Sequence, residues 1–239
     1  ALGVNYSRTE SNDVPSGGDW GEGVTDAMAY YSPIQPVRNE DGSWFSSSSV
    51  THYYNPVSMI NEDIMNYVKK RLQVTGKADL NIMKGLTWSA QFSYSDRQNI
   101  TSIYHSTQSQ ITQSNGQATR STYFSDKKVF ETYANYQANI GDHRLGFMVG
   151  YSWEESNQDD GFGLTVKDFY NDNLKYYDLT FANKIDGIDA VESGNLSTLR
   201  MISFYGRANY SFADKYSLQA TLRRDVSSAF GKNNRWATF

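Results

Sequence analysis

The chain has 239 residues, a formal net charge of −4 at pH 7 and no cysteine. Without cysteine it can form no disulfide framework, thiolate metal site or cysteine nucleophile. Its mild acidity argues against a broad nucleic-acid-binding surface. No stretch approaches the roughly 18 apolar residues that a membrane-spanning helix needs. A transmembrane β-barrel remains compatible with this composition, because only alternate side chains of a barrel strand face lipid.

Two further features of the composition favour long strands. Aromatic residues make up 15% of the chain, which is typical of barrels whose strands carry aromatic residues near both membrane interfaces. The chain contains only 4 prolines, which suits uninterrupted pairing because proline donates no ladder hydrogen bond.

In chain order, a short strand over 2–8 is followed by a long polar stretch. Two short helices are expected within this stretch. The first covers 24–31 and stops before Pro33. The second covers 57–67, with Asn55 as its N-cap and Pro56 at its first position. Small helices in an outer loop fit a lid or a docking surface better than a disordered linker.

The remaining expected strands show period-two alternation of apolar and polar residues. They cover 68–82, 86–98, 127–140, 144–155, 199–212 and 215–226. Each is about as long as a tilted transmembrane strand, which needs ~9–11 residues. The apolar rows are expected to face lipid. The polar rows are expected to face the lumen, among them Arg71, Asp79, Gln91, Gln137, Asn139 and Arg207.

The connections alternate between short and long. Three tight hairpins are expected at 83–85, 141–143 and 213–214. The stretches 11–67, 99–126 and 156–198 are long and are expected to be extracellular loops. This asymmetry is typical of outer-membrane barrels. The predicted fold class is all-β: about seven strands of a large antiparallel transmembrane β-barrel. A closed eight-stranded barrel is the alternative, and the ragged ends favour a segment of a longer chain.

Candidate chemistry is sparse. Asp159–Gly161 and Asn171–Asn173 could hold calcium, but their spacing fits turns better. Glu154 and Glu155 are adjacent on one expected strand and therefore point to opposite faces, so they cannot flank one glycosidic bond. We expect no catalytic residues, no metal site and no cofactor. The best contact candidates are loop aromatics, whose alternative role is packing within the loop: Trp20, Tyr30, Tyr31, Trp44, Phe45, Tyr53 and Tyr54.

The C-terminal half contains three short motifs in succession: S-x-x-G-R-x-N-Y over 203–210, D-K-Y-x-L over 214–218, and an arginine- and serine-rich stretch over 224–236. Their defining residues are Gly206, Arg207, Asn209, Tyr210, Lys215, Tyr216, Arg224, Asp225, Ser227, Ser228, Phe230 and Trp236. On these residues the chain resembles the SusC/RagA family of TonB-linked outer-membrane transporters of Bacteroidetes, in which the third motif reads R-x-D-G-S-S-x-F with a downstream R-W. Val226 stands where glycine is usual in the family and Ala229 where a basic residue is common, which puts only the local geometry in doubt.

The resemblance implies a barrel of about 22 strands with a plugged lumen, located in the cell outer membrane. The plug domain is not expected in this chain. The implied partners are outer-membrane lipid, a SusD-like surface lipoprotein, TonB through the missing N-terminal part, and an oligosaccharide or peptide cargo. Two other classes stay open: a soluble all-β carbohydrate- or protein-binding module, and an outer-membrane enzyme or adhesin barrel. Solubility without detergent would favour the module.

Overall fold

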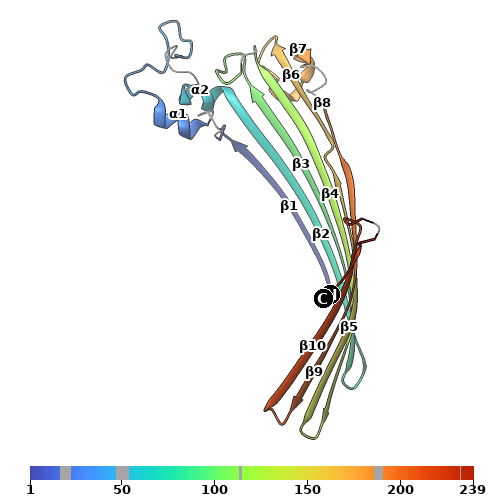
Figure 1. The fold of residues 1–239 in the computed structure, drawn as a ribbon. Coiled ribbons are helices and arrows are strands. Elements are labelled where there is room, and N and C mark those ends of the chain that lie inside the picture. Colours follow the sequence, from blue (N-terminus) through green and yellow to red (C-terminus); the bar gives the residue numbers. More distant parts are fainter. Residues whose placement is uncertain (17–22, 47–53, 113–114, 186–190, 232) are drawn as a thin grey trace.

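The main feature of the fold is one tall, curved antiparallel sheet (Figure 1). The computed structural model describes residues 1–16, 23–46, 54–112, 115–185, 191–231 and 233–239. The strand path through the sheet is β1-β2-β3-β4-β5-β9-β10-β11, and β6 branches from β4 and carries β7 and β8. The strands on the path are β1 (Leu2–Asp13), β2 (Asp63–Met83), β3 (Leu86–His105), β4 (Gln117–Ile140), β5 (His143–Asp159), β9 (Leu196–Phe212), β10 (Tyr216–Ser227) and β11 (Trp236–Thr238).

All seven expected strands are present, each paired with its neighbour in sequence or across a long connection. The tight hairpins are also confirmed, at the β2–β3, β4–β5 and β9–β10 junctions. Gly85 and Gly141 take the left-handed backbone conformation in the first two turns, with φ of 83° and 58°. In the third turn, where the Phe212 carbonyl accepts a hydrogen bond from the Lys215 N–H, Ala213 and Asp214 have φ of 50° and 56°. Positive φ at both central positions is the geometry of a type I′ turn, which matches the twist of the flanking strands.

The strands run further than the alternation predicts. β4 has 24 residues and β3 has 20, about twice the length that crosses a membrane. As a result, the long connections are shorter than 11–67, 99–126 and 156–198. They are 14–62, 106–116 and 160–195, and the last of these holds β6 (Phe162–Phe169), β7 (Ala182–Ile185) and β8 (Val191–Ser193). Where a strand extends beyond the hydrocarbon core of the membrane, both of its faces can be polar. The alternation of apolar and polar residues then fades, although backbone pairing continues.

The helical expectation needs one correction. α1 (Val24–Tyr30) forms as expected, but α2 spans only Pro56–Glu62, and residues 63–67 already belong to β2. Asn55 caps α2 by accepting hydrogen bonds from the backbone N–H groups of Val57 and Ser58. The next turn is lost to the sheet because Tyr67 pairs with Ser11 on one side and with Thr101 on the other.

Burial is concentrated at the upper end of the molecule, where α1 and α2 lie on the concave side of the sheet (Figure 1). One core cluster joins β3, β4 and β6 to two short 3-10 turns, η1 (Lys175–Tyr177) and η2 (Leu179–Phe181), and its centre is Tyr104 and Phe169. A second core cluster joins α1 to α2 through Val24, Ala27 and Met59.

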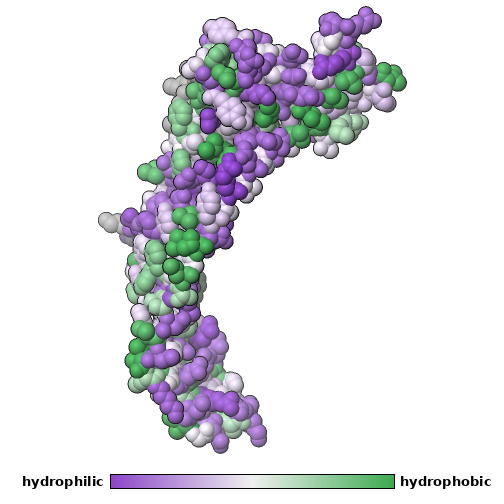
Figure 2. Space-filling model, turned by 180° about the vertical axis from the view of Figure 1, so that it is seen from behind, coloured by the Kyte–Doolittle hydropathy of each residue, from purple (hydrophilic) through white to green (hydrophobic). Residues whose placement is uncertain are grey.

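The lower strands bury none of their apolar rows against a second layer within the described residues. Val149 and Leu222 are 64% and 63% exposed, and Figure 2 shows hydrophobic side chains along the lower half of the sheet above a largely hydrophilic tip. A soluble sandwich would pack these rows against each other. The open apolar face therefore favours a wall that meets lipid over the soluble binding module.

Candidate functional site

The two faces of the sheet differ in chemistry over the whole lower half. The register places Ala134 between Trp88 and Val149, and Tyr136 between Leu86 and Phe147, so apolar rows continue from strand to strand. The opposite face is polar, and in a membrane barrel that face lines the lumen. All six residues expected to be lumenal lie on it: Arg71, Asp79, Gln91, Gln137, Asn139 and Arg207.

Charged residues on the polar face are mostly paired. Lys127 Nζ lies 2.7 Å from Glu154, and Lys77 Nζ lies 3.2 Å from Asp79. Glu155, next to Glu154 in sequence, pairs with residues on the other face of the sheet. The expectation that these two glutamates point apart is confirmed, which leaves them without the shared geometry of a glycosidase pair.

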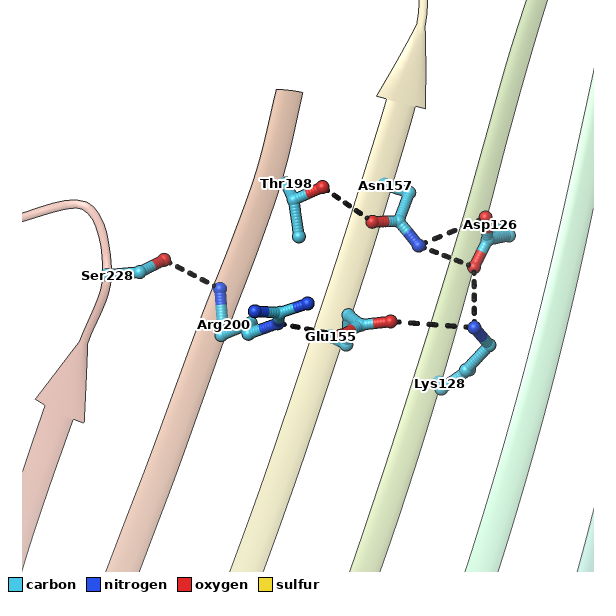
Figure 3. A network of polar contacts seen from close by, with 7 residues as sticks. All are labelled: Asp126, Lys128, Glu155, Asn157, Thr198, Arg200 and Ser228. Carbon is cyan, nitrogen blue, oxygen red and sulfur yellow. Dashed lines mark hydrogen bonds and ion pairs between the residues drawn. The ribbon is translucent and has the colours of Figure 1, made fainter. Parts of the chain in front are cut away.

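A network of polar side chains follows the apolar rows on the outward face of β4, β5 and β9 (Figure 3). Glu155 accepts a hydrogen bond from Arg200 Nε at 2.8 Å and lies 3.5 Å from Lys128 Nζ. Asn157 Nδ2 donates to both carboxylate oxygens of Asp126 at 3.2 and 3.1 Å. The two carboxylates are partly buried, whereas the Arg200 side chain is largely exposed. Their position shows where the outward face leaves hydrocarbon and meets water.

The loop aromatics divide between packing and exposure. Trp44 is 8% exposed; its Nε1 donates to Glu62 at 2.8 Å, and the Arg38 guanidinium lies 3.6 Å from the ring centroid. Tyr54 packs against the cluster between α1 and α2, whereas Tyr30 is 62% exposed. Tyr31 donates its hydroxyl hydrogen to the Pro36 carbonyl at 2.8 Å, and Phe45 is half-buried. Trp20 and Tyr53 lie outside the described residues.

A buried polar contact that sequence reasoning missed fixes the 106–116 connection. His105 Nδ1 lies 2.7 Å from Asp63 Oδ1, and Ser109 donates to the same oxygen at 2.6 Å. Asp63 and His105 are 3% and 9% exposed. Since the two residues are 42 positions apart, only the β2–β3 register could have revealed the contact.

Asp172, considered above as a calcium ligand or a turn residue, attaches its loop to β3. It accepts hydrogen bonds from the Tyr104 hydroxyl at 2.6 Å, and from the Thr107 backbone N–H at 2.8 Å and hydroxyl at 2.6 Å. Burial alone would raise the pKa of Asp172, but the hydrogen bonds from Thr107 and Tyr104 outweigh it and lower this pKa below its usual range. The carboxylate therefore stays charged at neutral pH and holds the loop against the strand.

Alanine in place of Asp172 is expected to open this loop, because hydrogen bonds to a charged group contribute about 1.5–3 kcal/mol. Amide hydrogen exchange should accelerate at residues 107 and 170–177. Asp178→Ala is the matched control, since among the described residues the Asp178 side chain bonds only to Thr180, two positions away. Equal exchange in both variants would show that Asp172 does not hold the loop.

The family-motif residues lie together on β9, β10 and the segment that follows. Gly206, Arg207, Asn209 and Tyr210 are on β9. Lys215 ends the β9–β10 turn, and Tyr216 begins β10, which also holds Asp225 and Ser227. Phe230 follows in the next turn, where its carbonyl accepts a hydrogen bond from Arg235 Nε at 3.2 Å.

Three of these motif residues join β10 to its surroundings. Arg224 on β10 has its guanidinium 4.7 Å from the Trp236 ring centroid, and this contact accompanies the pairing of β10 with β11. Ser228 accepts a hydrogen bond from the Arg200 backbone N–H at 2.8 Å. The motif therefore fixes how β9, β10 and β11 meet.

The described residues contain no group of three or more histidine, cysteine, aspartate or glutamate side chains placed to hold a metal ion. In the same part of the chain, no helix is both long enough and apolar enough to cross a membrane.

No family model matches the chain. Over 230 residues it is 26% identical to TonB-dependent receptor P3 of Formosa agariphila, a match that covers 96% of this chain and 22% of that receptor. A stretch of 39 residues is 49% identical to TonB-dependent receptor SusC of Bacteroides thetaiotaomicron, covering 16% of this chain and 4% of SusC.

Among solved structures, the chain is similar to that of the RagAB peptide transporter. The TM-score is 0.78 at 23% sequence identity, over 99% of this chain and 27% of the matched transporter chain. The chain thus spans about a quarter of the length of the proteins it matches from end to end: 22% of TonB-dependent receptor P3 and 27% of the transporter chain. At this identity the structural match establishes the fold: an open sheet that corresponds to part of a barrel wall.

Proposed function

We propose that this chain is a segment of the β-barrel of a SusC/RagA-type TonB-dependent receptor in the outer membrane. There it would form part of the wall of a nutrient importer. The observation that carries the proposal is the division of one continuous sheet into an exposed apolar face and a charged polar face. Such a wall separates lipid from a wet lumen. The cargo class we propose is oligosaccharides or peptides, taken up with energy delivered through TonB.

A surface lipoprotein of the SusD type is the partner we propose for the extracellular end. Large apolar side chains are exposed on and around α1 and α2: Met28 is 66% exposed, Ile34 91% and Ile60 53%. Apolar groups gathered on an otherwise polar loop are typical of a protein-docking surface. The relatives are receptors and a transporter, so we expect transport without covalent chemistry.

Uptake by cells that express the full-length receptor tests the import proposal. Cells with and without the receptor gene are given mixed oligosaccharides and mixed peptides, and depletion from the medium is followed by mass spectrometry. Receptor-dependent depletion that stops when a protonophore collapses the inner-membrane proton gradient is the expected result. Equal depletion without the gene, or depletion that survives the protonophore, would contradict active import.

The docking proposal has its own test. Ile34→Asp combined with Ile60→Asp should abolish co-purification of a surface lipoprotein with the full-length receptor. Val149→Leu on the lipid side is the control and should leave the complex intact. A lipoprotein that still co-purifies with the double variant would show that it docks elsewhere.

A further inference from the structure

A cluster of unpaired cations lies on the lumenal face, which elsewhere carries several ion pairs. Arg71 on β2 lies directly opposite Arg97 on β3, and Lys69 lies two residues from Arg71 on the same face. Residues directly opposite in an antiparallel pair have Cα atoms roughly 4.5–5.5 Å apart. Throughout the described part of the chain, none of these three side chains makes a hydrogen bond or ion pair, in contrast to Lys77 and Lys127.

This arrangement works against the stability of the sheet. Like charges directly opposite each other on one face repel and destabilise the strand pair. The nearby carboxylates do not relieve this repulsion: Glu154 is paired with Lys127, and Asp96 and Asp126 lie on the outward face. A repulsive pair that points into a lumen is explained most simply by a ligand that neutralises it.

The cluster lies beside two adjoining hollows in the wall, of about 290 and 250 Å³, and Arg71 and Arg97 line both. Three further charged residues line the hollows: Lys127, which is paired with Glu154, and Lys70 and Asp126, whose positions in the register are on the outward face. The other lining residues carry hydroxyl or amide groups, one of them on an aromatic ring: Ser7, Thr9, Asn99, Ser95, Tyr123, Ser125, Ser156 and Gln158. Hydroxyl and amide groups suit a ligand that carries many hydroxyls, and an aromatic face can pack on a sugar ring.

The height of the cluster within the wall supports contact with incoming cargo. On the outward face of the same strands, Leu72 lies opposite Asp96, and Asp96 lies opposite Asp126. The apolar rows therefore end at this level, so Arg71 and Arg97 lie at the outer membrane boundary, in the extracellular part of the lumen. Cargo that enters from outside meets them early.

We propose that Arg71, Arg97 and Lys69 form a binding site for the carboxylate or sulfate groups of an acidic oligosaccharide. The planar guanidinium groups can each bind such an anion through two parallel hydrogen bonds, and Lys69 adds a third positive charge. This inference rests on the proposed import function, whose cargo it narrows to anionic glycans.

Calorimetric titration of the purified full-length receptor in detergent tests the site. The probes are tetragalacturonate, its carboxyl-reduced neutral counterpart, the sulfated form of that counterpart and tetraglutamate. At least one acidic saccharide should bind more tightly than the neutral tetrasaccharide. Arg71→Gln combined with Arg97→Gln should weaken that binding at least roughly tenfold, because charge-assisted hydrogen bonds are lost. Lys77→Gln, which alters a lumenal lysine already paired with Asp79, is the control.

Comparing tetragalacturonate with the sulfated tetrasaccharide shows whether the site recognises a carboxylate or a sulfate group. Unchanged binding of both acidic saccharides by the double variant, or no preference over the neutral tetrasaccharide, would overturn the proposal. Arginine-dependent binding of tetraglutamate alone would overturn it in favour of acidic peptides. Because these titrations need no transport, a receptor that binds the acidic probe but imports nothing would count against the proposed function and leave the site standing.

The melting temperature of the unliganded receptor is the second readout. Removing two repelling charges should leave it unchanged or raise it. A lower melting temperature in the double variant would mean that a carboxylate elsewhere in the receptor neutralises the arginines, and the site would then be structural.

Discussion

Arginine in place of Ala134 is expected to destabilise the folded receptor by about 2–4 kcal/mol, the penalty for a cation near the bilayer midplane on the lipid face of a barrel. Ala134 lies midway along the apolar row of β4, with Trp88 and Val149 opposite it on the two neighbouring strands. In the described strands an arginine there has no acidic neighbour on its own face, and it is too deep to reach water easily.

The measurement is reversible unfolding of the full-length receptor in phospholipid vesicles, followed by tryptophan fluorescence in urea. Asn135→Arg is the matched control: it is at the same depth on the same strand but on the polar face, between Thr87 and Met148. Its unfolding free energy should change by less than about 1 kcal/mol. Equal destabilisation by the two arginines would mean that the two faces do not meet different solvents.

Alanine in place of Gly85 is expected to destabilise the β2–β3 hairpin more than the same change at Gly141 destabilises the β4–β5 hairpin. Both glycines have positive φ, so each alanine costs roughly 1–2 kcal/mol in backbone strain. Only at Gly85 does the new Cβ collide with a fixed group, the backbone carbonyl oxygen of Gln137. That carbonyl cannot retreat easily, because Gln137 N–H donates to the Gly85 carbonyl at 2.7 Å.

The same unfolding assay compares the two turns. A Cβ added at Gly141 meets nothing within 4 Å, so Gly141→Ala isolates the backbone strain. The difference between the two variants then measures the steric collision alone. Equal unfolding free energies would show that β4 shifts away from the β2–β3 turn at little cost.

The membrane-spanning strands could be predicted from sequence because lipid imposes a strict rule on every second side chain. Ala134 and Tyr136 alternate with Asn135 and Gln137, and the hairpins at Gly85 and Gly141 mark where the chain reverses. The same rule explains where prediction failed. Above the membrane both faces of β3 and β4 meet water or protein, so the alternation fades and the strand ends at His105 and Gln117 could not be located.

Much of the candidate site depends on long-range register, which a single sequence does not encode locally. The lumenal position of Arg71 was predictable from alternation, but its place opposite Arg97 was not, since that depends on how β2 and β3 align. Trp44 was named for its aromatic ring, yet the ring is covered by Arg38 and bonded to Glu62. An exposed aromatic residue and a buried one in a long loop look alike in sequence.

Site-directed labelling along β4 tests most directly that one face of this sheet meets lipid and the other meets a wet lumen. The described chain has no cysteine, so single cysteines can be introduced at positions 132–137 of the full-length receptor once any cysteines elsewhere are removed. Fluorophores attached at 132, 134 and 136 should be quenched by brominated lipid tails. Cysteines at 133, 135 and 137 should instead react with a water-soluble maleimide. Uniform quenching, uniform reactivity or the reverse alternation would contradict the barrel-wall assignment.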